Sequence, residues 1–157
     1  MEPTNAKTDA VIELLALAPL VIAPLIRDLP EARRKERPAP GKWSAHEHVC
    51  HLPVVQDLMI ARFERMLAEP GCSIRPYDPA SDAEHVLLHA DLEDALSRYQ
   101  SARAELLIRL RALSMDEWRI AAQHPEYADY SVFTMFRHLG IHDMHHAGRV
   151  EELLLAR

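Results

Sequence analysis

Residues 131–150 read SVFTMFRHLGIHDMHHAGRV, and this stretch decides the fold class. Ser131 is a residue type that favours the N-cap of a helix. The apolar residues after it recur every three or four positions, which is the spacing of one face of an α-helix. At about 100° per residue, Met135, Leu139 and Val150 all lie within roughly 80° of His142. The stretch therefore predicts a helix that runs nearly to the C-terminus, with its histidines on the inward face.

Four histidines share this face within about 100° of arc: His138, His142, His145 and His146. A single histidine on an apolar face is more commonly a core residue with a satisfied hydrogen bond. A pair one helical turn apart is more specific. His142 and His146 can both place a ring nitrogen about 2 Å from one ion, which makes them candidate metal ligands.

A third candidate ligand lies earlier in the chain, at His51. Val55, Leu58 and Met59 mark the buried side of its helix, and His51 shares that side. Cys50 points about 100° away and is a poor companion ligand. Three inward histidines on two helices make a metal site the better interpretation. Four others are interpreted as surface or loop residues without a role: His46, His85, His89 and His124.

Three further helical patterns precede the last helix, and no convincing strand pair is present. They run from Val11 to Leu29, from Ser44 to about Leu67, and from about Ala83 or Asp91 to Leu113. Pro19 and Pro24 should kink or split the first helix, and Pro53 should kink the second. Four such helices predict an all-α four-helix bundle, in which the second and last helices meet around the histidines.

Turn and cap signals support these boundaries. Ser44 with Glu47, and Ser114 with Glu117, have the capping-box form, a hydroxyl three residues before a carboxylate. The second box is expected to open a single turn that carries Trp118. The segments 30–42, 70–82 and 124–130 are predicted as loops.

Length and charge narrow the function class. A chain of 157 residues is about one domain, so residues 1–157 are expected to fold as one unit. The balance of 18 basic against 24 acidic residues gives a net charge of −6, which argues against nucleic acid or an anionic membrane as the main partner. No signal peptide is evident, and the apolar run Leu14–Ile26 is too short to span a membrane. Two cysteines, too few for a disulfide framework, favour the cytoplasm.

Two motifs carry a resemblance to a known family. Residues 41–52, GKWSAHEHVCHL, and residues 142–150, HDMHHAGRV, resemble the two signatures of the DinB/YfiT-like superfamily. The resemblance spans nearly the whole chain. It implies a four-helix bundle that binds one divalent metal ion through His51, His142 and His146, in a protein that is often a homodimer. Characterised relatives include S-transferases that use low-molecular-weight thiols and a maleylpyruvate isomerase.

A three-histidine site would leave room for a metal-bound water or thiol, and hence for hydrolysis or thiol transfer on a small-molecule substrate. Imidazoles suit Zn, Ni, Fe or Cu alike. His138 and His145 are expected either to assist the ligands or, as the commoner fate, to be core residues with backbone partners. Asp143 suits a rim or supporting contact. The stretch HDMHH could be a variant of the HExxH motif, but no third ligand follows it downstream. A metal- or ligand-binding bundle without turnover stays open as an alternative.

Arg149 departs from the family pattern, which has glutamine at this position. It lies near the ligand face of the last helix, about 20° from His142. One hypothesis is that its guanidinium binds an anionic group of the substrate at the mouth of the site. The alternative is that it reaches solvent and pairs with Glu152.

Overall fold

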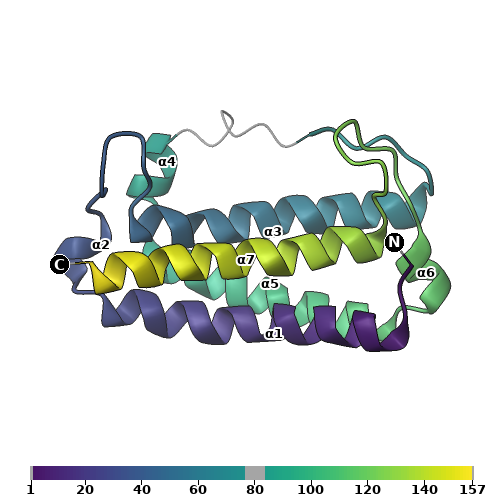
Figure 1. The fold of residues 1–157 in the computed structure, drawn as a ribbon, viewed down its shortest axis with the longest axis horizontal. Coiled ribbons are helices and arrows are strands. Elements are labelled where there is room, and N and C mark those ends of the chain that lie inside the picture. The colour runs from purple at the N-terminus through teal and green to yellow at the C-terminus, as the bar shows by residue number, and fades with distance from the viewer. Residues whose placement is uncertain (1, 77–83, 157) are drawn as a thin grey trace.

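The computed structural model describes residues 2–76 and 84–156 of the chain. Four long helices dominate it: α1 (Asn5–Asp28), α3 (Ala45–Ala68), α5 (Leu92–Ala112) and α7 (Val132–Leu155). Three short helices connect them: α2 (Glu31–Arg34), α4 (Glu84–His89) and α6 (Met115–Arg119). Within the described ranges, β-structure is limited to two isolated bridges. The predicted all-α four-helix bundle is confirmed (Figure 1).

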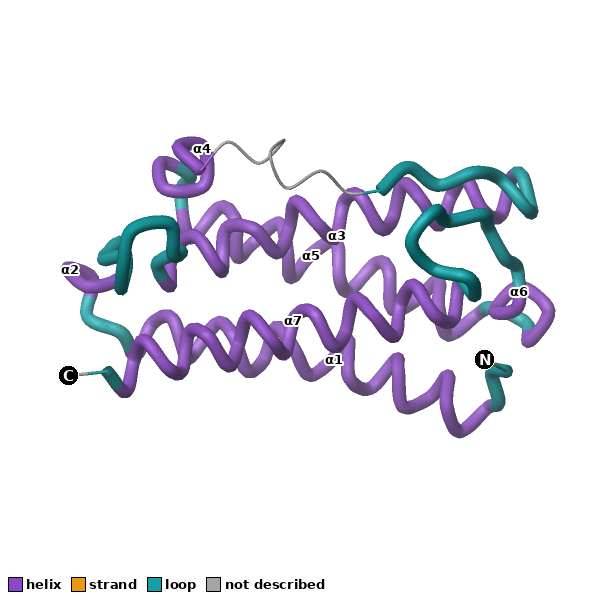
Figure 2. Tube along the Cα trace, turned by 45° about the horizontal axis from the view of Figure 1, so that its top comes forward, coloured by secondary structure: helices purple, strands orange, loops and turns teal. Residues whose placement is uncertain are grey.

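The long helices lie side by side along the bundle. α1 contacts α7 and α5, and α3 contacts α5 and α7 (Figure 2). The C-terminus and the short helices α2 and α4 lie at one end, while the N-terminus and α6 lie at the other (Figure 1). The predicted packing of the second long helix against the last is therefore correct.

Helix boundaries follow the capping signals closely. Ser44 and Ser114 both form complete capping boxes, and Ser131 caps α7 by accepting a hydrogen bond from the Thr134 N–H. The prolines within α1 and α3 split neither helix. Pro19 and Pro53 are buried, so their packing in the core compensates for the missing donor, whereas Pro24 lies on the exposed side of α1.

Two segments differ from the prediction. The predicted loop 30–42 contains the short helix α2, and the third pattern divides into α4 and a longer helix that Asp91 caps. Of the predicted excursion 70–82, the part that the structure describes pairs its backbone with the segment before α7, since Ile74 N–H donates to the Gln123 carbonyl. Residues 77–82 lie outside the described residues.

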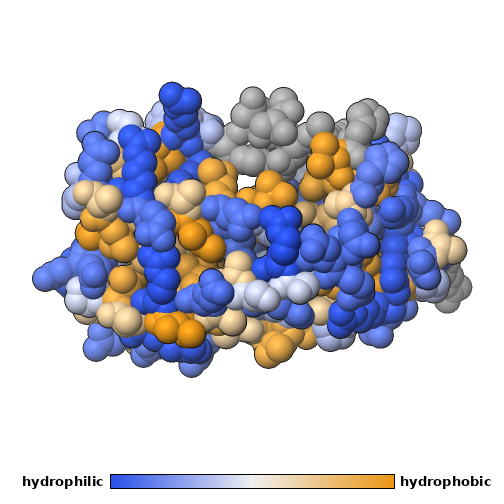
Figure 3. All heavy atoms as spheres, turned by 180° about the vertical axis from the view of Figure 1, so that it is seen from behind, coloured by the Kyte–Doolittle hydropathy of each residue, from blue (hydrophilic) through white to orange (hydrophobic). Residues whose placement is uncertain are grey.

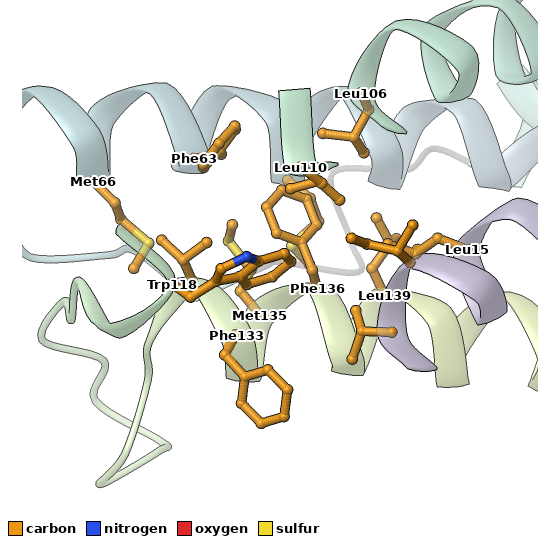
Figure 4. Packing of buried hydrophobic residues seen from close by; sticks show 14 of the residues in the cluster. Leu15, Phe63, Met66, Leu106, Leu110, Trp118, Phe133, Met135, Phe136 and Leu139 are labelled. Atoms are coloured by element: carbon orange, nitrogen blue, oxygen red, sulfur yellow. The ribbon is translucent and has the colours of Figure 1, made fainter. Parts of the chain in front are cut away.

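Two apolar clusters form the core, one toward each end of the bundle. The cluster near α6 contains several aromatic side chains, and in it the Trp118 ring meets the Phe133 and Phe136 rings edge to face (Figure 4). The other cluster uses small and branched residues such as Ala18, Ile22 and Ala147. On α7 the buried members of the first cluster end at Leu139 and those of the second begin at Ala147, and the polar layer described below lies between these two positions.

Helix α1 is long and apolar enough, by length and composition alone, to cross a membrane. In the bundle its Leu15, Ala18 and Ile22 are buried against neighbouring helices, as expected for a core helix. Leu17 and Leu20, away from this stripe, are 48% and 70% exposed. Elsewhere the surface is mixed, and on the face opposite to that of Figure 1 hydrophobic patches alternate with hydrophilic side chains (Figure 3).

Candidate metal centre

Three histidines from two helices converge in the middle of the bundle. His51 comes from α3, and His142 and His146 come from successive turns of α7. One ring nitrogen from each lies within 4.8 Å of the other two. His142 Nε2 and His146 Nε2 are 3.1 Å apart, and His51 and His146 are buried. The structure thus brings together all three residues that the sequence analysis selected.

A second histidine of α3, His48, contacts His146 on the side of the ring away from His142. The Nδ1 atoms of His48 and His146 are 2.8 Å apart, so one ring donates a hydrogen bond to the other. This contact leaves His146 Nε2 directed toward His142. The Trp43 ring covers the group, stacked on His146 with 6.0 Å between ring centroids and edge-on to His51 at 4.8 Å.

Asp143 anchors His142, the other candidate ligand on α7. Its Oδ1 atom lies 3.4 Å from His142 Nδ1. Its Oδ2 atom accepts hydrogen bonds from the Tyr99 hydroxyl at 2.8 Å and from Arg103 Nη2 at 2.7 Å. A carboxylate on the far nitrogen of a ligating histidine fixes its tautomer and orientation. The predicted supporting contact of Asp143 is present, although the residue is fully buried rather than at a rim.

Arg103 extends this polar layer across the bundle. Its side chain is 1% exposed and also donates to Gln56 Oε1 at 2.6 Å and to the Leu15 carbonyl at 2.8 Å. Every long helix therefore contributes to the network that holds Asp143.

Burial favours the neutral form of two imidazoles at the site, those of His48 and His146. Burial, reinforced by Arg149 and by neighbouring histidines, lowers the pKa of His48 to about 4. Burial also lowers the pKa of His146, followed by the effects of His142, His51 and His48. A neutral imidazole offers the lone pair that metal coordination needs, so the neutral form of His146 suits a cation.

A cavity of about 350 Å³ opens beside His51 and His142. The remaining wall combines apolar and aromatic side chains with one arginine and one glutamate: Val55, Leu58, Met59, Arg62, His124, Glu126, Tyr127, Tyr130 and His138. A pocket of this size accommodates a small molecule. A substrate there would have direct access to two of the three clustered histidines.

Arg149 lies at a different hollow, of about 460 Å³, that Trp43 and His48 also line. It is half-exposed, and its Nη1 atom donates to Glu152 Oε2 at 2.7 Å. The surface pairing considered for this residue is therefore present. Under the anion-binding hypothesis, Arg149 would bind an anion in the hollow beside His48 rather than in the cavity beside His142.

The interpretation of His138 and His145 as core residues is wrong, because both are exposed. His138 borders the cavity and faces the Tyr127 ring, and His145 meets the His146 ring edge-on. One histidine expected at the surface or in a loop is misjudged: His46 is buried in α3, with its Nε2 atom 3.5 Å from Cys50 Sγ. His124 lies in the predicted loop and is partly buried in the cavity wall.

Comparison with known proteins places this chain in a family. The model of the DinB superfamily matches residues 15–150. The chain belongs to the DinB superfamily. A Bacillus pumilus (strain SAFR-032) member named "Putative metal-dependent hydrolase" is 25% identical over 154 residues, which cover 96% of this chain and 87% of that protein.

A solved member of similar fold is YfiT from Bacillus subtilis, described as "a probable metal-dependent hydrolase with an unusual four-helix bundle topology". It superposes with a TM-score of 0.88 at 21% identity, covering 97% of this chain and 88% of that one. This likeness confirms the fold of the present DinB-superfamily protein, and its three-histidine cluster stands on the geometry above.

Proposed function

We propose that this protein binds one divalent metal ion through His51, His142 and His146, and that it is a metal-dependent enzyme acting on a small molecule. The convergence of three imidazole nitrogens within 4.8 Å carries the proposal. Three ligands are typical of catalytic sites, which keep a position open, whereas structural sites are closed by a fourth protein ligand. The adjoining cavity supports this interpretation, since a small molecule there would reach the open side.

A divalent ion in this position, whether Zn, Ni, Fe or Cu, would lower the pKa of a water or thiol toward neutrality and so supply hydroxide or thiolate as the nucleophile. The chain itself orients the histidines: Asp143 holds the Nδ1 side of His142, and His48 holds that of His146. Trp43 shields the group. We propose hydrolysis as the reaction, in line with the names of the relatives, and transfer of a low-molecular-weight thiol as the second possibility.

Elemental analysis of protein purified without chelators tests the metal site. We expect about one divalent ion per chain, and His142→Ala should lose most of it because two nitrogens alone hold the ion weakly. His89→Ala, at an exposed histidine of α4, is the matched control and should retain it. Full occupancy in His142→Ala would contradict the assignment.

A screen of the metal-loaded protein with esters, amides, and thiols paired with electrophiles tests catalysis. Turnover that His142→Ala abolishes supports an enzyme. A metal-loaded protein that processes none of these substrates would favour the non-catalytic metal- or ligand-binding bundle.

We further propose a homodimeric protein of one domain in the cytoplasm, without nucleic acid or membrane as partner. The exposed Leu17 and Leu20 of α1 support the dimer, since large apolar side chains on one helix face favour association. Two free, buried cysteines are consistent with a reducing compartment. A species of 17.9 kDa by light scattering at micromolar concentration would contradict the dimer.

A further inference from the structure

A buried guanidinium stands in the wall of the cavity beside the candidate metal site. Arg62 is 9% exposed and lines the same cavity as His51 and His142. Its Nη1 atom donates to the Tyr130 hydroxyl at 3.2 Å, and its Nη2 atom donates to the Arg75 carbonyl at 2.7 Å. Nη1 also lies 3.8 Å from Met59 Sδ, and all three partners are neutral groups.

No carboxylate among residues 2–76 and 86–156 forms an ion pair with Arg62. The contrast with Arg103 is direct, because that buried guanidinium meets the Asp143 carboxylate at 2.7 Å. A buried charge is normally paired, because desolvation of an isolated charge is costly. The one acid in the cavity wall, Glu126, is exposed and makes no ion pair with Arg62. The cavity thus holds a positive charge whose partner can come from a ligand.

The shape of the cavity adds a second constraint. Arg62 and His51 are eleven residues apart on α3, which is about 16 Å along the helix axis and nearly the same helix face. Between them α3 lines the cavity with apolar side chains, those of Val55, Leu58 and Met59. The His124 and Tyr130 rings, which also line the cavity, have centroids 4.7 Å apart. A ligand that touches both ends must be elongated, with its polar groups at the ends.

On the basis of the metal site proposed above, we infer that the substrate is an elongated small molecule with a terminal carboxylate or similar anionic group. Arg62 binds this anionic end, and the other end, which carries the reacting bond or thiol, lies at His51 and His142. A guanidinium suits this role because it can donate two parallel hydrogen bonds to one carboxylate.

Two matched thiols test the inference on the zinc-loaded protein: ω-mercaptohexanoate and the neutral ω-mercaptohexanol. Their thiol ends can bind zinc equally, so only the distal group differs. Isothermal titration calorimetry should show that the carboxylate binds about tenfold more tightly, as expected for a charge-assisted hydrogen bond. Arg62→Met should abolish this preference while the zinc content stays the same, and Arg62→Lys should restore part of it.

Three control variants show whether a different charged residue produces the preference. Arg65→Met removes an exposed arginine from the same helix, and Arg149→Met removes the rival cation at the other hollow. Both should keep the preference. Glu126→Gln removes the acid of the cavity wall and should strengthen binding of the carboxylate slightly.

The possible outcomes distinguish this inference from the proposed function. Equal binding of the two thiols to the wild-type protein, or an undiminished carboxylate preference in folded Arg62→Met, overturns the role of Arg62 and leaves the metal site standing. Loss of the preference only in Arg149→Met assigns anion binding to the other hollow and likewise overturns it. A protein that binds neither zinc nor thiol overturns the metal site and this inference together.

Discussion

Asp143 places a negative charge at the centre of the face that α7 turns into the bundle. It is fully buried, and its partner Arg103 is 1% exposed. Replacement by alanine would leave the guanidinium buried without a counter-charge, which typically costs about 3–5 kcal/mol. We therefore expect Asp143→Ala to lower the free energy of unfolding by about that amount, measured by urea denaturation. Asp57→Ala, which removes an exposed ion pair with Arg98, should cost about 0–1 kcal/mol. Equal losses in the two variants would contradict the role given to the polar layer.

His48 offers a second test, of metal affinity rather than of folding. If His146 uses Nε2 toward the metal, its Nδ1–H donates to His48 across 2.8 Å. Loss of such a supporting contact typically lowers metal affinity by about 10- to 100-fold. His48→Leu should show this loss in competition titrations with a chromogenic chelator. His145→Gln, at an exposed neighbour of His146, should retain the affinity of the wild type. An unchanged affinity in His48→Leu would contradict a supporting role.

The three histidines were predictable because helical spacing alone puts His142 and His146 on one side and gives His51 the buried side of its own helix. How deeply each residue is buried could not be predicted in the same way. The buried face of α7 is centred closer to Asp143 than to His142, so His138 and His145 lie outside it and are exposed. An aspartate on that face carries no signal of burial in the sequence, because burial depends on Arg103, 40 residues away. Arg62 was missed for the same reason: its surroundings come from other segments.

Among the helices, capping signals were the most reliable guide. The hydroxyl–carboxylate pairs at Ser44 and Ser114 act locally, so they form whatever the rest of the chain does. The short helix α2 was missed since four residues are too few to show a periodic pattern. The prolines gave a wrong expectation of split helices because a local signal was overridden by the rest of the chain. Their local cost is real, but tertiary packing along α1 and α3 outweighs it.

The two glycines of α7 test how tightly α1 packs against it. A Cβ atom at Gly140 would lie 2.8 Å from Leu14 Cδ2, whereas one at Gly148 would meet nothing within 4 Å. Alanine gains about 0.5–1 kcal/mol over glycine inside a helix. Gly148→Ala should therefore raise the free energy of unfolding by about that amount. The free energy of unfolding of Gly140→Ala should be about 1–3 kcal/mol lower than that of Gly148→Ala, because the extra methyl group overpacks the contact with Leu14. Thermal unfolding of both variants checks this order, and equal gains would show a looser interface.

At the scale of the whole molecule, a polar layer between two apolar clusters is the feature that joins folding to the site. The clusters hold the helices together toward each end, and the layer between them holds Asp143, Arg103 and the histidines. A bundle could be predicted from four amphipathic patterns, but the position of this layer depends on how the helices are staggered. Stability and site chemistry are thus linked through the same buried groups.

This link predicts how the metal-free protein responds to acid. In the folded state the pKa of His48 is lowered to about 4, first by burial and then by Arg149, His145 and His51. In the unfolded chain its pKa is about 6.5, so below that pH the unfolded state binds more protons. The free energy of unfolding should therefore fall as the pH decreases from about 6.5 to 4, by on the order of 3 kcal/mol for this residue. His146, whose pKa burial also lowers, adds to the same trend.

Urea denaturation of chelator-treated protein between pH 7 and pH 4 measures the slope. His48→Gln cannot be protonated and should flatten it, whereas His89→Gln, at an exposed histidine of α4, should leave it as in the wild type. Metal binding stabilises the folded state and needs the same neutral imidazoles, so the loaded protein should unfold with a steeper dependence on pH. A wild-type slope in His48→Gln would mean that His48 takes up a proton as readily in the bundle as in the unfolded chain. The acid response would then have to come from other groups.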